Sequence, residues 1–332
     1  MHSTDHAAPT IVDVARAAGV SKSLVSLAIR GDAGVSEATR TRILAVADTL
    51  GYRSNVLARG LARGRTQVLG VLVSDLSNPY HSDVVSGIEA RAEGAGLGTV
   101  IGHGQGDPAV LAARLDQMLD LGVDGVIVVS AMLPADALDA AAARRPVVMV
   151  GRPFEQPRRV SVVRNHDERG AALAVTHLQD LGHHGIVHLA SSHRAAASAR
   201  RLAYGEAMTR AGLPTSTLWV DEGGIETLIA GAVGSAGPTA CFAGNDRTAA
   251  ALLHDAMDAG LDVPAAFSIV GYDDAQIARQ VRPGLTTVAQ PREAIGREAA
   301  RLLLARIDGD KDTVEVTLEP SLTVRGTTAA PC

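Results

Sequence analysis

The stretch TIVDVARAAGVSKSLVSLAIR, residues 10–30, contains the signals for two short helices in immediate succession. Thr10 followed three residues later by Asp13 forms a capping box, which predicts that the first helix begins here. Gly19 ends that helix, and Ser21 caps the second helix only three residues after the first one ends. Apolar residues at helical spacing let the two segments pack together. The stretch therefore predicts a helix-turn-helix near the start of a chain of 332 residues.

A third helix follows and completes a small core. Ser36 caps it, Ile43 and Ala47 lie along one stripe, and Gly51 stands at its end. Three short helices around so small a core leave the outward face of the second helix free. That face carries Lys22, Ser23, Ser26 and Leu27. In this motif the second helix enters the major groove of DNA and its first residues meet base edges. The sequence thus favours a DNA-binding headpiece over a purely structural helical hairpin.

The distribution of charge points to the same partner. The whole chain carries a formal net charge of −5, but residues 1–66 hold nine lysines and arginines against five acids, a balance of +4. The rest of the chain holds 22 basic and 31 acidic residues, a balance of −9. A small basic unit joined to a large acidic one predicts a polyanionic partner for the first unit only.

The segment between the headpiece and the apolar body, residues 55–66, is basic and rich in glycine. Asn55 is able to cap a short helix, but the segment contains two glycines, each costing about 1 kcal/mol relative to alanine in a helix interior. We expect it to fold only on DNA and against its twin in a dimer, with Leu61 as an apolar wedge in the minor groove and Arg59 on the backbone. A flexible basic linker is the alternative.

The body of the chain alternates short apolar runs with stretches of helical pattern. The runs are VLGVLVSD, LGTVIGH, GVIVVS and PVVMVGR, then GIVHLASS, TLWVDE, TACFAGND and FSIVGYDD. This alternation predicts an α/β fold with parallel sheets, and the two series predict two subdomains divided near residue 160. Ligands of such sheets bind at the carboxyl ends of the strands. Those ends carry Asp75, Ser130 and Arg152 in the first series and Ser191, Asn245, Asp246 and Asp273 in the second.

The sequence resembles the lactose/galactose repressor (LacI/GalR) family of bacterial transcription regulators. The headpiece carries the resemblance first, and LGVLVSDLSNPY, DGVIVV, HLQDLGHHGIVHL, CFAGND, FSIVGYDD and RPGLTTVAQP continue it from about residue 9 to 325. It implies a headpiece over residues 1–54, a hinge over 55–66, and an effector-binding and dimerisation domain over 67–332. That domain is expected to resemble periplasmic binding proteins, with subdomains divided near 160 and 288.

The resemblance also implies a function and the residues that carry it. The family's members bind a palindromic operator as dimers, and a small polar metabolite or sugar alters their affinity for DNA. The implied DNA-binding residues are Thr10, Ser21, Lys22, Ser23, Ser26, Leu27, Arg30, Asn55, Arg59 and Leu61. The effector residues carried over by motif are Asp75, Tyr80, Arg200, Asn245, Asp246, Asp273 and Gln290. The helix PREAIGREAARLLLARI is expected to return to the first subdomain and TVEVTLEPSLTV to the second.

Several positions depart from the family pattern. Leu27 stands where many members place a polar base-reading residue, so it is expected to meet a thymine methyl group. Ser54 replaces a common proline before the hinge, and His166 replaces a common aspartate. The segment Gly223–Ile225 lacks an aromatic residue that often stacks on a sugar, and the chain has only eight aromatic residues. A polar effector that is not a sugar therefore stays open.

The sequence argues against catalysis, cofactors, metals and membranes. GHGQGD lacks the spacing of a dinucleotide fingerprint, and neither a nucleophile elbow nor a Walker loop is present. The histidines of LGHHGIVHL enter a strand, which would scatter them rather than gather them around a metal. With neither a signal peptide nor a membrane-length apolar run, we expect a cytoplasmic protein. The alternative to a regulator is a soluble small-molecule-binding protein without specific operator function.

The hinge hypothesis gives a first prediction. Replacing Leu61 by alanine should weaken binding to the specific operator far more than binding to non-specific DNA, because a wedge acts only where the hinge folds on its proper site. Titrations of the variant on both DNAs at one salt concentration measure this difference. Equal losses on the two DNAs would remove the wedge from the mechanism.

Overall fold

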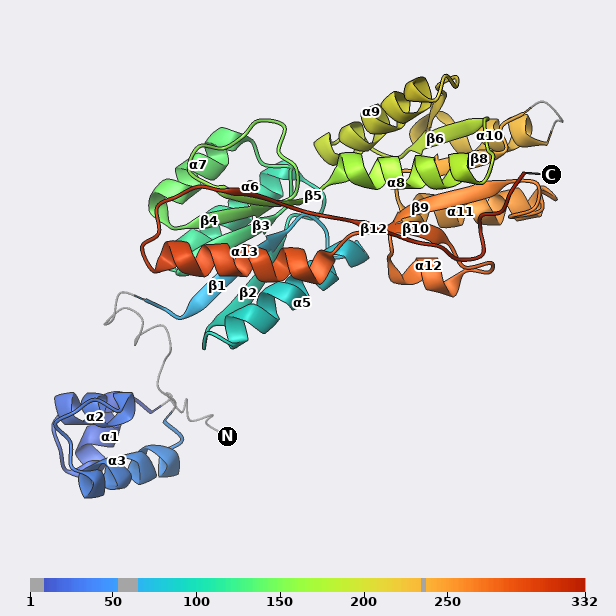
Figure 1. Cartoon of the computed structure of the whole chain (residues 1–332). Helices are drawn as coiled ribbons and strands as arrows, with labels where there is room; N and C mark the ends of the chain where they lie inside the picture. Colours follow the sequence, from blue (N-terminus) through green and yellow to red (C-terminus); the bar gives the residue numbers. More distant parts are fainter. Residues whose placement is uncertain (1–8, 53–64, 234–236, 332) are drawn as a thin grey trace, which may run out of the picture. The chain divides into compact units, whose positions relative to one another are not determined.

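The computed structural model describes residues 9–52, 65–233 and 237–331. The chain divides into two compact units, Met1–Gln67 and Val68–Cys332, each described here by itself (Figure 1). In the part of the chain that the structure describes, no helix is long and apolar enough to cross a membrane.

In the described part of the first unit, three helices surround a small apolar core. They are α1 (Ile11–Ala18), α2 (Lys22–Arg30) and α3 (Glu37–Thr49). The predicted capping box forms, because Thr10 donates from both its backbone N–H (3.0 Å) and its hydroxyl (2.7 Å) to the Asp13 carboxylate. Gly19 adopts a φ of 64°, which lets α1 end and the chain turn into α2. Together α1 and α2 confirm the predicted helix-turn-helix.

The second unit is built on two six-stranded sheets with corresponding strand orders. The first sheet has the order β11-β5-β4-β3-β1-β2, and all of its pairs are parallel. Its strands are β1 (Val68–Val73), β2 (Gly98–His103), β3 (Gly125–Val129), β4 (Val147–Val150), β5 (Ser161–Asn165) and β11 (Glu315–Leu318). The second has the order β12-β10-β9-β8-β6-β7, and only β12 runs antiparallel. Its strands are β6 (Ile186–Ala190), β7 (Thr217–Trp219), β8 (Ala240–Ala243), β9 (Ser268–Asp273), β10 (Thr286–Ala289) and β12 (Ser321–Thr323).

Helices cover both faces of each sheet (Figure 1) and bury the continuous apolar runs of the strands. On the first sheet α5 (Pro79–Glu93) and α13 (Arg292–Ile307) share one face, and α6 (Pro108–Asp120) and α7 (Ala135–Arg144) share the other. On the second, α8 (Asp167–Asp180) and α9 (Ala195–Arg210) lie opposite the remaining helices. Those are the short 3-10 helix η1 (Val220–Glu222), α10 (Gly224–Ala232), α11 (Asp246–Asp258) and α12 (Gln276–Gln280).

The chain passes between the two sheets in three places. It leaves the first sheet after Asn165, returns to it after Ala289, and leaves it again after Leu318. The expectation that TVEVTLEPSLTV belongs to the second subdomain is wrong for its first half. That half forms β11, which pairs in parallel with β5 of the first sheet, and only the second half pairs with β10.

Two glycines allow α5 and α13 to pack with their backbones in contact. A Cβ atom at Gly296 would lie 2.0 Å from the carbonyl oxygen of Val84, and one at Gly87 would lie 2.2 Å from that of Glu293. Backbone atoms cannot move aside as flexible side chains do. The returning helix α13 is therefore held on the first sheet at a distance that only glycine permits.

Replacing Gly296 by alanine should lower the free energy of unfolding by about 1–3 kcal/mol, the usual cost of overpacking. Urea denaturation of the purified protein measures the change. The control is Gly205→Ala on α9, where a Cβ would meet nothing within 4 Å. In that variant the free energy of unfolding should rise by about 0.5–1 kcal/mol, because alanine is the better helix former. Equal stability of the two variants would contradict the packing argument.

Candidate functional site

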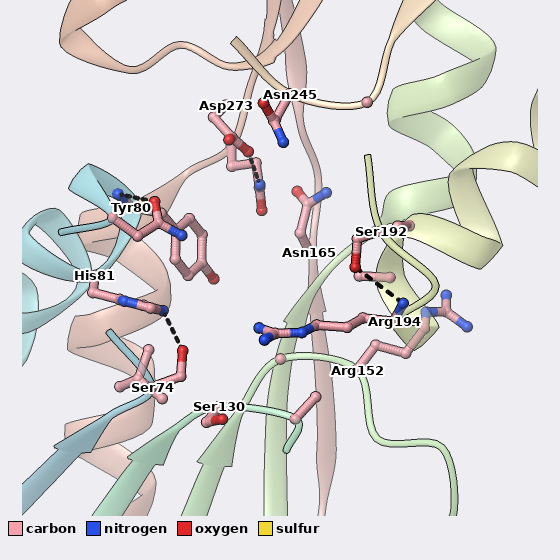
Figure 2. A pocket seen from close by; sticks show the side chains of 18 of the residues that line it. Ser74, Tyr80, His81, Ser130, Arg152, Asn165, Ser192, Arg194, Asn245 and Asp273 are labelled. Carbon is pink, nitrogen blue, oxygen red and sulfur yellow. Dashed lines mark hydrogen bonds between the residues drawn. The ribbon is translucent and has the colours of Figure 1, made fainter. Parts of the chain in front are cut away.

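The carboxyl ends of strands from both sheets converge on one cavity of about 390 Å³ (Figure 2). In each sheet the chain adds strands first on one side of the starting strand and then on the other. The direction changes between β1 and β3 in the first sheet and between β6 and β8 in the second. Helices leave such neighbouring strands in opposite directions, which opens a crevice at that point. The residues that follow these four strands therefore supply the centre of the site.

The first sheet contributes several polar side chains that are held by hydrogen bonds. The Ser74 hydroxyl lies 3.2 Å from His81 Nε2, and the other ring nitrogen of His81 contacts the backbone carbonyl of Asp75 (Figure 2). Asp75 accepts from the hydroxyl of Ser77 at 2.6 Å and from the Ser77 backbone N–H at 2.9 Å. These two bonds lower the pKa of the Asp75 carboxyl. Ser130 Oγ accepts from the backbone N–H of Met132 at 3.1 Å. Each side chain is thereby fixed in direction at the cavity wall.

A buried ion pair between Arg200 and Asp167 forms the core of the second wall. Arg200 Nε donates to Asp167 Oδ1 at 2.9 Å, and Nη1 donates to the Gly244 carbonyl at 2.9 Å. The guanidinium carbon stands 3.7 Å from the centroid of the Tyr272 ring. Burial lowers the pKa of Arg200, but the charges of Asp167, Tyr272 and Asp273 together outweigh burial and raise that pKa. Arg200 is thus held as a cation.

Two further contacts connect this ion pair to the first sheet. Asn165, the last residue of β5, donates from Nδ2 to the hydroxyl of Tyr272 on β9 at 2.7 Å. Arg152 follows β4 and points to the start of α8, where its Nε lies 3.6 Å from Asp167 Oδ2 and it pairs with Glu168. The position of Arg200 therefore depends on both sheets.

The remaining polar residues line the wall formed by β8, β9 and β10. Asp273 Oδ1 accepts from Gln290 Nε2 at 2.6 Å, and burial raises the pKa of the Asp273 carboxyl (Figure 2). Asn245 donates to Ser191 Oγ at 2.9 Å, and its Oδ1 accepts from the Thr248 N–H at 2.8 Å, which caps α11. Amide, hydroxyl and carboxylate groups here match the hydroxyls or amines of a small polar ligand.

The structure brings nine of the ten predicted effector residues to this cavity. They are Asp75, Tyr80, Ser130, Arg152, Ser191, Arg200, Asn245, Asp273 and Gln290. Sequence reasoning missed several polar residues that also line it. These are Ser74, Asn78, His81, Asn165, Asp167, Ser192, Arg194 and Arg247. Asn165 ends and Asp167 follows the short strand SVVRN, which forms β5 and contains only two apolar residues, so its sequence signal is weak.

Asp246 is the exception, because its carboxylate is turned away into the fold. Its side chain is 1% exposed, Oδ2 accepts from the Ala275 N–H at 2.7 Å and Oδ1 accepts from the Thr287 hydroxyl at 2.5 Å. Burial, reinforced by Asp273, raises the pKa of Asp246 to about 7. It anchors α11 to the β9–α12 connection and to β10 instead of facing a ligand.

The predicted DNA-binding residues in the described headpiece lie at the N-caps of α1 and α2 and along α2. Lys22 and Ser23 are exposed at the first turn of α2, while Ser26 and Leu27 are half-buried. Ser21 Oγ accepts from the Leu24 N–H at 3.2 Å, so this hydroxyl caps α2. The side chain of Arg30, and the residues Asn55, Arg59 and Leu61, lie outside the described part of the chain.

The histidines of LGHHGIVHL are separated by the fold. His183 bonds to Thr239 and Ser268, whereas His188 Nδ1 lies 2.9 Å from the Phe242 carbonyl oxygen. Within residues 9–52, 65–233 and 237–331, no group of three or more metal-ligating side chains is found.

Comparison with known proteins places the chain in a family. Residues 10–55 match the bacterial regulatory proteins of the lacI family, and residues 175–328 match the periplasmic binding protein-like domain. Catabolite control protein A of Priestia megaterium is 32% identical over 317 residues, which span 93% of this chain and 95% of that protein. The transcriptional repressor PurR of Photobacterium profundum is 31% identical over 328 residues, spanning 95% and 97%.

A solved structure of the lac repressor dimer, bound to operator and the anti-inducer ONPF, matches with a TM-score of 0.85 and 27% identity, covering 98% of this chain and 100% of that one. The chain belongs to the LacI family of bacterial regulatory proteins. It is a ligand-responsive DNA-binding regulator of transcription, which confirms the predicted family, fold class and function. Its relatives are transcriptional regulators and not enzymes.

The raised pKa of Asp246 predicts a pH dependence of stability. The folded state holds this proton up to about pH 7, while the unfolded chain releases it near the usual aspartate pKa of 3.8. Stability from this group is therefore present below about pH 4 and is lost as the pH rises towards 7, on the order of 2–4 kcal/mol. In Asp246→Asn the amide still bonds to the Ala275 N–H and to Thr287, provided that the Thr287 hydroxyl accepts instead of donating. The variant should therefore lack the loss of stability between pH 4 and pH 7 that comes from Asp246.

Urea denaturation between pH 4 and pH 8 measures the difference between the wild type and the variant. The control is Asp258→Asn at the end of the same helix, where the side chain is 73% exposed. Parallel stability curves for the wild type and Asp246→Asn would show that the buried carboxyl does not titrate in this range.

Proposed function

We propose that this regulator binds a palindromic operator as a homodimer and takes a sugar or another small polar metabolite in the cavity between its two sheets. The observation that supports this most is the cavity itself, because side chains from the strand ends of both sheets converge there. We assign residues 1–54 to the DNA-binding headpiece, 55–66 to the hinge, and 67–332 to effector binding and dimerisation. Since a bacterial regulator of transcription must reach DNA, we propose that the protein is cytoplasmic.

Within the headpiece, Lys22, Ser23, Ser26 and Leu27 are the proposed readers of the major groove. The exposed start of α2 supports this, since the free N–H groups and the dipole of a helix start favour phosphate nearby. The Thr10 hydroxyl donates to Asp13 and the Ser21 hydroxyl caps α2, and both residues are proposed to contact the DNA backbone at these helix starts. Arg30, Asn55, Arg59 and Leu61 complete the set proposed from the family resemblance.

The contacts between the sheets suggest how the effector acts. Asn165 and Tyr272 join the first sheet to the second beside the Arg200–Asp167 pair, and both sheets contribute to the cavity wall. A ligand that bridges the two walls favours one relative position of the subdomains over others. A coupling of about 1–3 kcal/mol between effector and operator is typical of such a device.

Selection of bound fragments from a random-centre DNA pool tests the operator proposal. The full-length protein should enrich a palindrome whose affinity falls steeply with salt, in contrast to the same fragments after scrambling. Lys22→Ala should weaken binding and reduce the salt slope by about 1 if the lysine neutralises a phosphate, or relax one base position if it reads a base. If the protein binds DNA without sequence preference at every salt concentration and with every effector tried, the alternative stands, a small-molecule-binding protein without operator function.

The chain contains only two lysines, Lys22 and Lys311, which makes a matched control simple. Lys311→Ala removes the same charge from an exposed position in the second unit and should leave the salt slope unchanged. Amine-specific labelling of the wild type gives a second measurement, in which bound operator should protect Lys22 and not Lys311.

A further inference from the structure

A second cavity adjoins the effector cavity. This second cavity, the annex, measures about 500 Å³ and shares two lining residues, Ala131 and Arg194, with the effector cavity. All of the residues that line the annex are apolar except Glu155 and Arg194, whereas the effector cavity is lined mainly by polar residues. A ligand that extends from one cavity into the other therefore meets two kinds of surface.

The connection between β3 and α7 forms one wall of the annex. Ser130 lines the effector cavity, and its Oγ accepts from the Met132 N–H at 3.1 Å. Leu133 belongs to an apolar core cluster of the first sheet, and the half-buried Met132 packs against that cluster. Both side chains line the annex. One hydrogen-bonded turn thus provides a polar residue for the effector cavity and apolar residues for the annex.

The connection between β4 and β5 forms another wall and carries Phe154. This connection is fixed on both sides of Phe154. Arg152 pairs with carboxylates at the start of α8. Further along, the backbone N–H groups of Arg158 and Arg159 donate to the Asp139 carboxylate on α7 at 3.0 and 2.8 Å. Because α7 directly follows the first wall, the two walls are tied to each other.

Phe154 stands apart from the other phenylalanines of the chain. It is 70% exposed, whereas Phe242 and Phe267 are buried in the core. A single exposed apolar side chain is ordinary on a protein surface. This one, however, lines an apolar cavity together with Met132 and Leu133. An apolar group placed there would be removed from water by all three side chains, which is favourable in proportion to the area buried.

We propose that the annex is a subsite for an aromatic ring of the effector, whose polar part occupies the effector cavity. A cavity of this size accommodates such a ring. Phe154 offers an aromatic face, and Arg194 from the second subdomain offers a guanidinium, which packs favourably on aromatic rings. This inference rests on the proposed effector function and defines the class of effector: a polar head joined to an aromatic group, as in an aryl glycoside.

A ligand-observed NMR titration of the full-length protein with benzyl alcohol tests the subsite directly. A fragment of this size should bind with a Kd on the order of 1 mM. Phe154→Ala should raise that Kd about tenfold because it removes the aromatic contact. Its Tm should stay unchanged, since the side chain is mostly exposed. The matched control is Leu121→Ala, which removes another exposed apolar side chain of the same subdomain and should keep the wild-type Kd.

Pairs of phenyl and methyl glycosides connect the subsite to the effector. The probes are the β-D-glucopyranosides and the β-D-xylopyranosides. In a pair that binds, the phenyl member should bind about tenfold more tightly than the methyl member, because only the phenyl group reaches the annex. Phe154→Ala should remove this preference, and Leu121→Ala should keep it.

The proposal is overturned if benzyl alcohol does not bind, or if it binds wild type and Phe154→Ala equally. Equal Kd values for the two members of a pair that binds overturn it as well. Where no glycoside binds, the benzyl alcohol titration decides alone. Methyl glycosides that bind while benzyl alcohol does not would overturn the annex and leave the proposed effector cavity standing. Operator selection is independent of all these probes, so the failure of one proposal is distinguishable from the failure of the other.

Discussion

The buried pair of Arg200 and Asp167 is the interaction on which the cavity depends. Two charges taken out of water cost several kcal/mol each, and such a pair is tolerated only when further groups satisfy its remaining hydrogen-bonding capacity. The Gly244 carbonyl and the face of the Tyr272 ring do this for Arg200. The pair thereby fixes α8, α9 and the ends of β8 and β9 relative to one another, and these elements carry most of the second wall.

The same pair makes the cavity sensitive to the relative position of the two sheets. Arg152 and Asn165 reach it from the ends of β4 and β5, so the first sheet contributes to its surroundings. The residues that follow the strands at the crevices of both sheets line one cavity, so a ligand there contacts both sheets. In the proposed function, a ligand that contacts both walls favours one relative position of the two subdomains.

The headpiece and most of the strands could be predicted from the sequence because their signals are local. Thr10 with Asp13, Gly19 and Ser21 determine helix ends within a few residues, and apolar runs mark buried parallel strands. What was missed depends on contacts distant in sequence. TVEVTLEPSLTV contains two strands of different sheets, and only pairing with β5 and β10 separates them. Asp246 follows a strand end as Asp75 does, yet Ala275 and Thr287 draw its carboxylate into the core.

The scarcity of aromatic residues has a structural counterpart in the cavity. Trp219, the single tryptophan of the chain, stacks against His193 with ring centroids 4.0 Å apart and is not among the residues that line the cavity in the described chain. Tyr80 is the one phenylalanine, tyrosine or tryptophan side chain among those lining residues. A site with so little stacking surface must select its ligand by charge and hydrogen bonds. The polar groups of Ser191, Asn245 and Asp273 are therefore the feature that separates this cavity from one built to stack on a sugar ring.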